Sequence, residues 1–153
     1  MLSATSKYAL RVLVALDGAP AGQFVPGRTL AEHTWIPSNY LSKVLLALRN
    51  AEIVDTVRGQ HGGYRLARDS EGIKLIDVVE VFEGFRSHPS CLLGVHTECS
   101  DKNPCSAHAS FRDVRSMYIR FLEETSIAEV ARMEKPGLAS IGGSITEPSQ
   151  RQA

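Results

Sequence analysis

The sequence predicts a mainly α-helical fold that contains one small β-hairpin. Apolar residues recur with the spacing of a helix along most of the chain, and one β-branched run followed by a glycine-rich turn interrupts that spacing. The chain has 153 residues, of which 43% are hydrophobic and 22% are charged. This composition is typical of one ordinary globular domain, large enough to form a core without disulfide bonds.

Three helices are expected in the first third of the chain. Residues 5–16 carry apolar side chains at positions i, i+3, i+4 and i+7, and the glycines and proline of residues 18–22 end this helix. Residues 28–34 allow about two further helical turns. Pro37 separates them from a third helix, which we expect Ser38 to cap. Two short helices joined by a tight turn are typical of a helix-turn-helix.

A β-hairpin is expected directly after the third helix. Residues 53–58 are rich in β-branched side chains, residues 59–63 contain three glycines, and residues 64–67 supply the second strand. A helix-turn-helix followed at once by a hairpin is a winged helix-turn-helix. The hairpin, or wing, can reach the backbone or minor groove of a nucleic acid.

The rest of the chain is expected to form a core helix, a long loop and a dimerisation helix. Residues 72–83 are apolar over most of a helix circumference, and Ser126 is expected to cap a short terminal helix. From residue 107, apolar side chains follow a heptad spacing, which suits pairing with a second subunit or packing on the chain's own core. The predicted units are a winged helix-turn-helix DNA-binding domain (1–84), a cysteine loop (85–106), a dimerisation helix with the short terminal helix (107–135) and a disordered tail (136–153).

Three cysteines and a histidine gather in and just after the cysteine loop. Cys91, Cys99, Cys105 and His108 are spaced C-x7-C-x5-C-x2-H. Thiolates favour iron–sulfur clusters, zinc or copper(I), and a loop lets each ligand take its own direction. Structural zinc sites space their thiolates in closer pairs, so these gaps argue against zinc. His96 lies in the same stretch and is a competing ligand, although we expect it to be solvated.

The expected location of the protein is the cytoplasm. No apolar run reaches the roughly 18 residues of a membrane span, and the first residues lack a basic stretch followed by an uninterrupted apolar core. In a reducing cytoplasm, clustered cysteines indicate metal binding or catalysis rather than disulfides. The sequence has no nucleophile elbow, phosphate-binding glycine loop or paired carboxylates, so we expect a protein that is not an enzyme.

Four segments of the chain resemble one family of bacterial regulators. They are KYALR at residues 7–11, IPSNYLSKVL at 36–45, the wing VRGQHGGYRLA at 57–67, and the three-cysteine loop. In these segments the chain is similar to the winged helix-turn-helix iron–sulfur transcription regulators that include IscR, NsrR and RirA. The resemblance covers residues 1–135.

The resemblance implies a homodimeric repressor that binds a palindromic operator in double-stranded DNA. It also implies an iron–sulfur cluster that senses iron, redox state or nitric oxide. The ligands of IscR-like members map onto Cys91, Cys99, Cys105 and His108, whereas the aspartate of NsrR-like members is replaced here by Lys7. The long first gap is more like that of RirA. Three thiolates with an imidazole suit [2Fe-2S], and three thiolates with an open fourth site suit [4Fe-4S].

Two groups of polar residues are the expected DNA contacts. The first residues of a recognition helix meet base edges in the major groove, and a wing meets phosphate or the minor groove. Residues 1–70 carry eight basic and five acidic side chains, against nine and twelve in residues 71–153, which permits DNA binding by the first half. The expected contacts are Ser38, Asn39, Tyr40 and Lys43 on the helix, and Arg58, Gln60 and His61 on the wing.

Two other functions are compatible with the sequence. A metal-free DNA-binding regulator could use the cysteines as a thiol-based redox switch, and it would be colourless after anaerobic purification. A protein-interaction adaptor could keep the winged helix without an operator, and it would lack the salt-dependent affinity of a DNA-binding protein.

Overall fold

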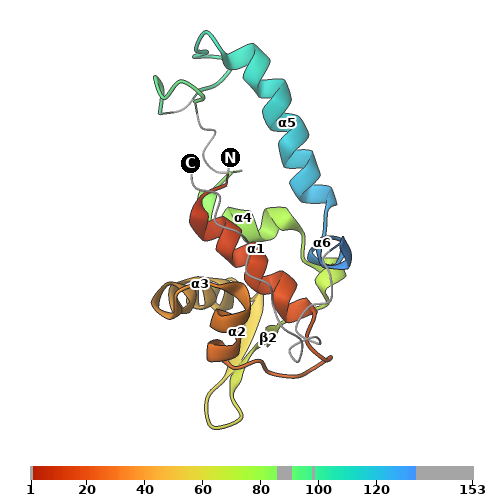
Figure 1. Ribbon diagram of the computed structural model, residues 1–153. Helices are drawn as coiled ribbons and strands as arrows, with labels where there is room; N and C mark the ends of the chain where they lie inside the picture. Colours follow the sequence, from red (N-terminus) through yellow and green to blue (C-terminus); the bar gives the residue numbers. More distant parts are fainter. Residues whose placement is uncertain (1, 86–90, 98, 134–153) are drawn as a thin grey trace, which may run out of the picture.

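The structure, a computed structural model, describes residues 2–85, 91–97 and 99–133. Within these ranges it contains six α-helices and one two-stranded antiparallel sheet (Figure 1). This confirms the predicted fold, a mainly α-helical winged helix-turn-helix with a small hairpin. The predicted tail at residues 136–153 lies outside the described residues.

Helix α1 (Ala4–Asp17) is the centre of the core. Its side chains Ala9, Val12 and Leu13 are fully buried, as the helical spacing predicts. The helix packs against α2, α3, α4, α6 and strand β2. The hydroxyl of Ser3 caps the helix by accepting a hydrogen bond from the backbone amide of Ser6.

The helix-turn-helix consists of α2 (Gly27–Thr34) and α3 (Ser38–Asn50). Trp35 ends α2 in the left-handed region at φ 56°, a conformation uncommon for a residue other than glycine. The expectation that Ser38 caps α3 is wrong. Pro37 stands at the capping position without a side-chain hydrogen bond. Because Pro37 is extended, its carbonyl already accepts from the Tyr40 and Leu41 amides, and Ser38 falls inside the first turn.

The wing is formed by β1 (Val54–Val57) and β2 (Gly63–Leu66), which pair antiparallel from Val54 opposite Leu66. Val25 adds a bridge on the outer side of β2, where its backbone exchanges two hydrogen bonds with Tyr64. A side chain at Gly63 would collide with the Val25 backbone, so a glycine is required at this close approach.

The second half begins with a 3₁₀ turn (Ser70–Gly72) and α4 (Leu75–Glu83). Helix α4 starts three residues later than expected, because the side chain of Asp69 caps the 3₁₀ turn first. Helix α5 (His108–Glu124) packs on α4 through its second half, and α6 (Ile127–Met133) returns to α1. Ser126 caps α6 as predicted, in a reciprocal pair of hydrogen bonds with Glu129.

The heptad seam of α5 divides between two environments. Tyr118 of the seam packs against the core, next to Leu122, which lies off the seam and is 1% exposed. Val114 and Phe121 of the seam are 61% and 52% exposed. Among the described residues, no helix is both long enough and apolar enough to cross a lipid bilayer.

Glu83 joins the end of α4 to the start of α1. Its Oε1 accepts a hydrogen bond from the Ser3 amide at 2.8 Å and from the buried Ser6 hydroxyl at 2.6 Å. Burial raises the pKa of the Glu83 carboxyl, but the hydrogen bonds from Ser3 and Ser6 together outweigh it, and the pKa falls below its usual value. The ionised carboxylate therefore stabilises the junction of the two helices.

We predict that Glu83→Gln lowers the free energy of unfolding by about 1.5 kcal/mol at neutral pH, the size of a hydrogen bond to a charged group. The folded pKa is depressed, so the wild-type advantage is present above the unfolded pKa and is lost as the pH falls through the folded pKa. Urea unfolding at about pH 7 and about pH 3 measures this difference. Glu124→Gln is the control, and an equal effect of Glu83→Gln at both pH values would contradict the prediction.

Candidate cofactor site and nucleic-acid interface

The three cysteines converge at the outer end of α5. The Sγ atoms of Cys91, Cys99 and Cys105 all lie within 4.8 Å of one another, and all three thiols are free. Cys99 is only 8% exposed. A small cavity of about 50 Å³ adjoins them, and it is lined by Leu92, Cys99, Cys105, His108, Phe111, Arg112 and Arg115.

Short turns in the loop bring the thiols together. The Gly94 amide donates to the Cys91 carbonyl, and Gly94 has a positive φ of 67° that closes this turn. The Asn103 amide donates to the Ser100 carbonyl and closes a second turn between Cys99 and Cys105. The loop thus reverses direction twice, so that cysteines distant in sequence face one another.

The beginning of α5 completes the site. The His108 amide donates to the Cys105 carbonyl, which fixes the last cysteine against the first helical turn. Farther along α5, Arg115 donates to the carbonyl of Phe85, and the Phe85 ring packs edge-on against Tyr118. These contacts connect the helix to the first residue of the cysteine loop.

The electrostatic surroundings of the thiols differ. Burial raises the pKa of the Cys91 thiol, but backbone amides of His96, Leu93 and Val95, with a smaller contribution from Cys105, outweigh it and lower the pKa to about 6. At Cys99 a backbone hydrogen bond from Cys105 lowers the pKa, but burial and the neighbouring thiols raise it above its usual value. The amides around Cys91 therefore favour negative charge on its sulfur.

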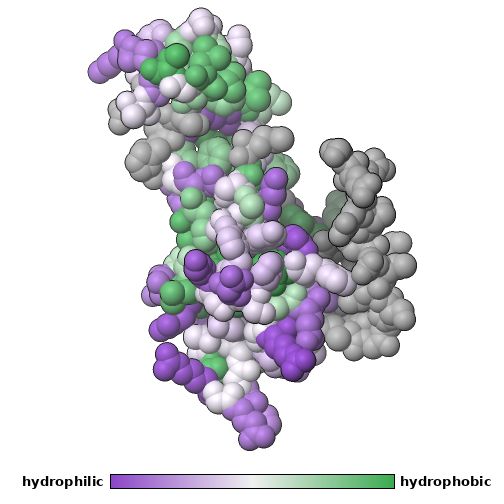
Figure 2. Space-filling view, turned by 60° about the vertical axis from the view of Figure 1, so that its left-hand side comes forward, coloured by the Kyte–Doolittle hydropathy of each residue, from purple (hydrophilic) through white to green (hydrophobic). Residues whose placement is uncertain are grey.

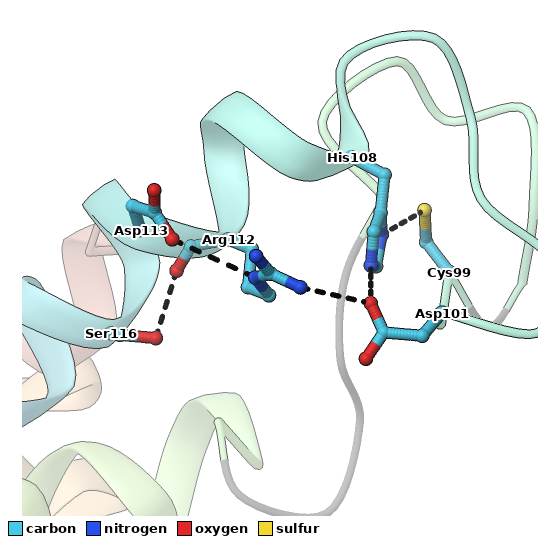
Figure 3. Close-up of polar contacts among 6 residues, drawn as sticks. All are labelled: Cys99, Asp101, His108, Arg112, Asp113 and Ser116. Atoms are coloured by element: carbon cyan, nitrogen blue, oxygen red, sulfur yellow. Dashed lines mark hydrogen bonds and ion pairs between the residues drawn. The ribbon is translucent and has the colours of Figure 1, made fainter.

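His108 lies between Cys99 and a carboxylate (Figure 3). Its Nδ1 is 3.1 Å from the Sγ of Cys99, and its Nε2 is 3.0 Å from Oδ1 of Asp101. The same oxygen accepts a hydrogen bond from Arg112 at 3.2 Å. The hydrogen bond from His108 and the charge of Arg112 hold the pKa of Asp101 below its usual value. The competing histidine, His96, is instead within hydrogen-bond distance of Asn103.

Asp101 and Arg112 are the residues of this site that sequence reasoning missed. Arg112 follows His108 by four residues, which places the two side chains on one face of a helix. That spacing could have indicated from the sequence that Arg112 lies beside His108. The contact of Asp101 with these side chains could not be inferred from the sequence, because it depends on the turn between Ser100 and Asn103.

The four residues predicted to read DNA lie at the start of α3, and all are exposed. Tyr40 is the most constrained of them. Its hydroxyl is 2.7 Å from the Thr5 hydroxyl, and its ring packs edge-on against Tyr8 at 5.4 Å between centroids. Tyr40 thus attaches the start of α3 to α1, while Lys43 lies one turn farther along the exposed face.

The wing residues Arg58, Gln60 and His61 are exposed at the tip of the hairpin, at the opposite end of the molecule from the cysteines (Figures 1 and 2). A groove of about 580 Å³ separates the wing from α3, and it contains Arg49 and Arg58. Arg49 was not among the predicted contacts. It lies seven residues after Ser42, which lines the same groove, so the two residues share one helical face.

Together, an exposed helix-turn-helix, a wing beside it and a separate cysteine site define a winged-helix regulatory protein. The chain matches the family model described as "Rrf2: Iron-dependent Transcriptional regulator" over residues 2–133. The HTH-type transcriptional regulator IscR of Vibrio cholerae is 31% identical over 128 residues, which cover 82% of this chain and 73% of that protein. The chain belongs to the Rrf2 family of winged-helix transcription regulators. It is a DNA-binding regulator, and its relatives are named as regulators, which are not enzymes.

Solved structures show the same fold. CymR of Bacillus subtilis, described as its global cysteine regulator, superposes with a TM-score of 0.73 at 24% identity, covering 88% of this chain and 98% of that one. IscR of T. potens superposes with a TM-score of 0.69 at 21% identity, covering 96% and 93%. These superpositions confirm the predicted winged-helix fold. The family match and the relative from Vibrio cholerae confirm the resemblance that the sequence motifs indicate.

Proposed function

We propose that this regulator is a cytoplasmic repressor that senses iron, redox state or nitric oxide through an iron–sulfur cluster in the cysteine site. The convergence of the Cys91, Cys99 and Cys105 sulfurs within 4.8 Å is the observation that carries this proposal. Sulfur donors at this mutual distance suit a [2Fe-2S] or [4Fe-4S] cluster, which is held by cysteine thiolates. When bound, the cluster would supply a redox-active and removable iron centre.

The donor set fits such a group. Cys91, Cys99 and Cys105 would hold the cluster, with the Nδ1 of His108 adjacent to Cys99 as the fourth donor. The amides of Leu93, Val95 and His96 favour the thiolate of Cys91. Arg112 and Arg115 line the neighbouring cavity and add positive charge beside anionic sulfur. Leu92 and Phe111 contribute apolar surface to the lining of the same cavity.

The units inferred from the sequence suit three separate functions. The winged helix (1–84) would bind the operator, the loop (85–106) would bind the cluster, and residues 107–135 would join two subunits. We infer that Ser38, Asn39, Tyr40 and Lys43 face the major groove, and that Arg58, Gln60 and His61 contact phosphate or the minor groove. Their exposure at one end of the molecule supports this assignment.

A homodimer would place two winged helices on a palindromic site. Val114, Met117 and Phe121 support this proposal, since they form a stripe along α5 and are 61%, 71% and 52% exposed. Their spacing of three and four residues puts them on one face of the helix. An apolar stripe of this kind is commonly covered by a partner, and a second copy of α5 would supply a matching one.

A second candidate function is a thiol switch without a metal. The proximity of three free thiols favours it, because formation of one disulfide would need only a modest movement of the loop. Two thiols would lose two electrons and two protons to an oxidant such as a peroxide or a disulfide. The same site therefore offers two sensing chemistries that a spectrum can distinguish.

Anaerobic purification tests the cluster. We expect a coloured protein with bound iron and sulfide, and loss of both in Cys91→Ala, Cys99→Ala and Cys105→Ala. His96→Ala is the matched control, because His96 pairs with Asn103 and should leave the colour unchanged. A wild-type protein that stays colourless and iron-free after reconstitution would refute the cluster. Reversible loss of its DNA binding with diamide would then support the thiol switch.

DNA titrations on a site selected from random sequence test the two contact groups. Lys43→Ala should weaken binding to the selected site by about 1–3 kcal/mol and relax its sequence preference. Arg58→Ala should weaken binding to all DNA alike and reduce the slope against salt concentration by about 1. Arg132→Ala removes an exposed cation from α6 and serves as the control. Equal behaviour of all three variants would contradict the assignment.

Sedimentation measurements test the dimer. Met117→Glu inserts a charge into the exposed stripe and should shift the protein toward the monomer by at least about tenfold in dissociation constant. Ser116→Glu places the same charge on another exposed face of α5, where we expect no change. A dimer that tolerates Met117→Glu would place the subunit contact elsewhere.

A further inference from the structure

One carboxylate oxygen joins two side chains of α5 beside the cysteines. Oδ1 of Asp101 lies 3.0 Å from Nε2 of His108 and 3.2 Å from a guanidinium nitrogen of Arg112. His108 and Arg112 are separated by one helical turn, so both approach Asp101 from the same face of α5 (Figure 3). The His108 side chain is 15% exposed, whereas that of Asp101 is 75% exposed.

The arrangement determines which nitrogen of His108 carries hydrogen. A carboxylate paired with a guanidinium accepts hydrogen bonds and donates none. The hydrogen of the neutral imidazole must therefore be on Nε2, which faces Asp101. Nδ1 is then left with its lone pair toward the Sγ of Cys99, at 3.1 Å.

We propose that Asp101, anchored by Arg112, is a positioning residue that holds His108 with an unprotonated Nδ1 directed at the Cys99 thiol. Carboxylate partners of this kind orient ligating histidines in metal sites, and their loss typically weakens metal affinity by about 10–100-fold. The use of Nδ1 as a ligand rests on the proposed cluster. The orientation of the ring rests only on the contacts of Asp101.

The contribution of Asp101 to global stability is expected to be small. An ion pair between exposed side chains is worth little, because water screens it. Variants at this position should therefore fold, and their effects would report on His108. Asp113 supplies a matched control. Its Oδ1 lies 3.6 Å from Nε of Arg112, and its side chain is 78% exposed. It thus pairs with the same arginine as Asp101 does, but the structure describes no contact between it and His108.

Nitrogen-15 spectra of the metal-free full chain test the positioning directly. At about pH 8 we expect one His108 tautomer with hydrogen on Nε2 and a downfield, slowly exchanging Nε2–H signal. Asp101→Ala should lose that signal, and Asp113→Asn should keep it. An unchanged signal in Asp101→Ala would overturn the proposal.

Release of iron to a chelator tests the consequence for the cluster. We expect release from Asp101→Ala to be at least about tenfold faster than from the wild type. Asp101→Asn, whose amide oxygen still accepts from Nε2, should fall between the two, and Asp113→Asn should match the wild type. Equal release rates for wild type and Asp101→Ala, in a protein whose His108→Ala variant releases iron faster, would overturn the proposal.

The two measurements separate this inference from the proposed function. A wild-type protein that binds no iron refutes the cluster, and the spectra of the metal-free chain still decide the role of Asp101. A protein with a stable cluster and an unchanged Nε2–H signal in Asp101→Ala keeps the proposed function and refutes the positioning role.

Discussion

The burial of helix α1 in the core connects the two halves of the molecule. Val12 and Leu13 are fully enclosed, and a buried side chain of this kind contributes about 1.5–3 kcal/mol relative to exposure. Helices α2 and α3 pack on one part of α1, and α4 and α6 pack on others. Helix α3 and helix α4, which contacts α5, therefore share a single central element. A displacement of α4 or α6 would be transmitted to α3 through side chains of α1.

Polar contacts reinforce that connection at the first turn of α1. Glu83 attaches the end of α4 to Ser3 and Ser6, and Thr5 in the same turn meets the hydroxyl of Tyr40 on α3. The chain enters the cysteine loop shortly after Glu83. A change in the loop is thus separated from the recognition helix by one short series of hydrogen-bonded residues, which gives a physical basis for coupling between the two ends of the molecule.

The cysteine site is constructed differently from the core. Loop turns and the first turn of α5 hold it, and exposed apolar residues Leu92, Leu93 and Val95 surround it (Figure 2). Few buried contacts restrain such a segment, so its stability is expected to depend strongly on what it binds. A site of this construction suits a sensor, because occupancy and local order change together.

The elements of the fold were predictable where a local rule governs them. The spacing of Ala9, Val12 and Leu13 predicted the buried face of α1, and Pro37 predicted the break before α3. Such rules failed where two neighbouring residues could each occupy the capping position of a helix. Pro37, not Ser38, occupies the capping position of α3, and Asp69 takes the capping role that delays α4. The α5 seam also divides between core and solvent, which a repeat in one helix cannot reveal.

The sequence alone predicted the order of the elements, the winged helix, and the three cysteines and the histidine that meet at the cysteine site. These follow from residue type and spacing, which act over a few turns of chain. The tertiary structure was needed to show that the three sulfurs meet within 4.8 Å and that Asp101 faces His108. Those contacts depend on how two loop turns fold against the first turn of α5. The backbone conformation of the whole loop determines these contacts, and residue spacing in the sequence does not reveal that conformation.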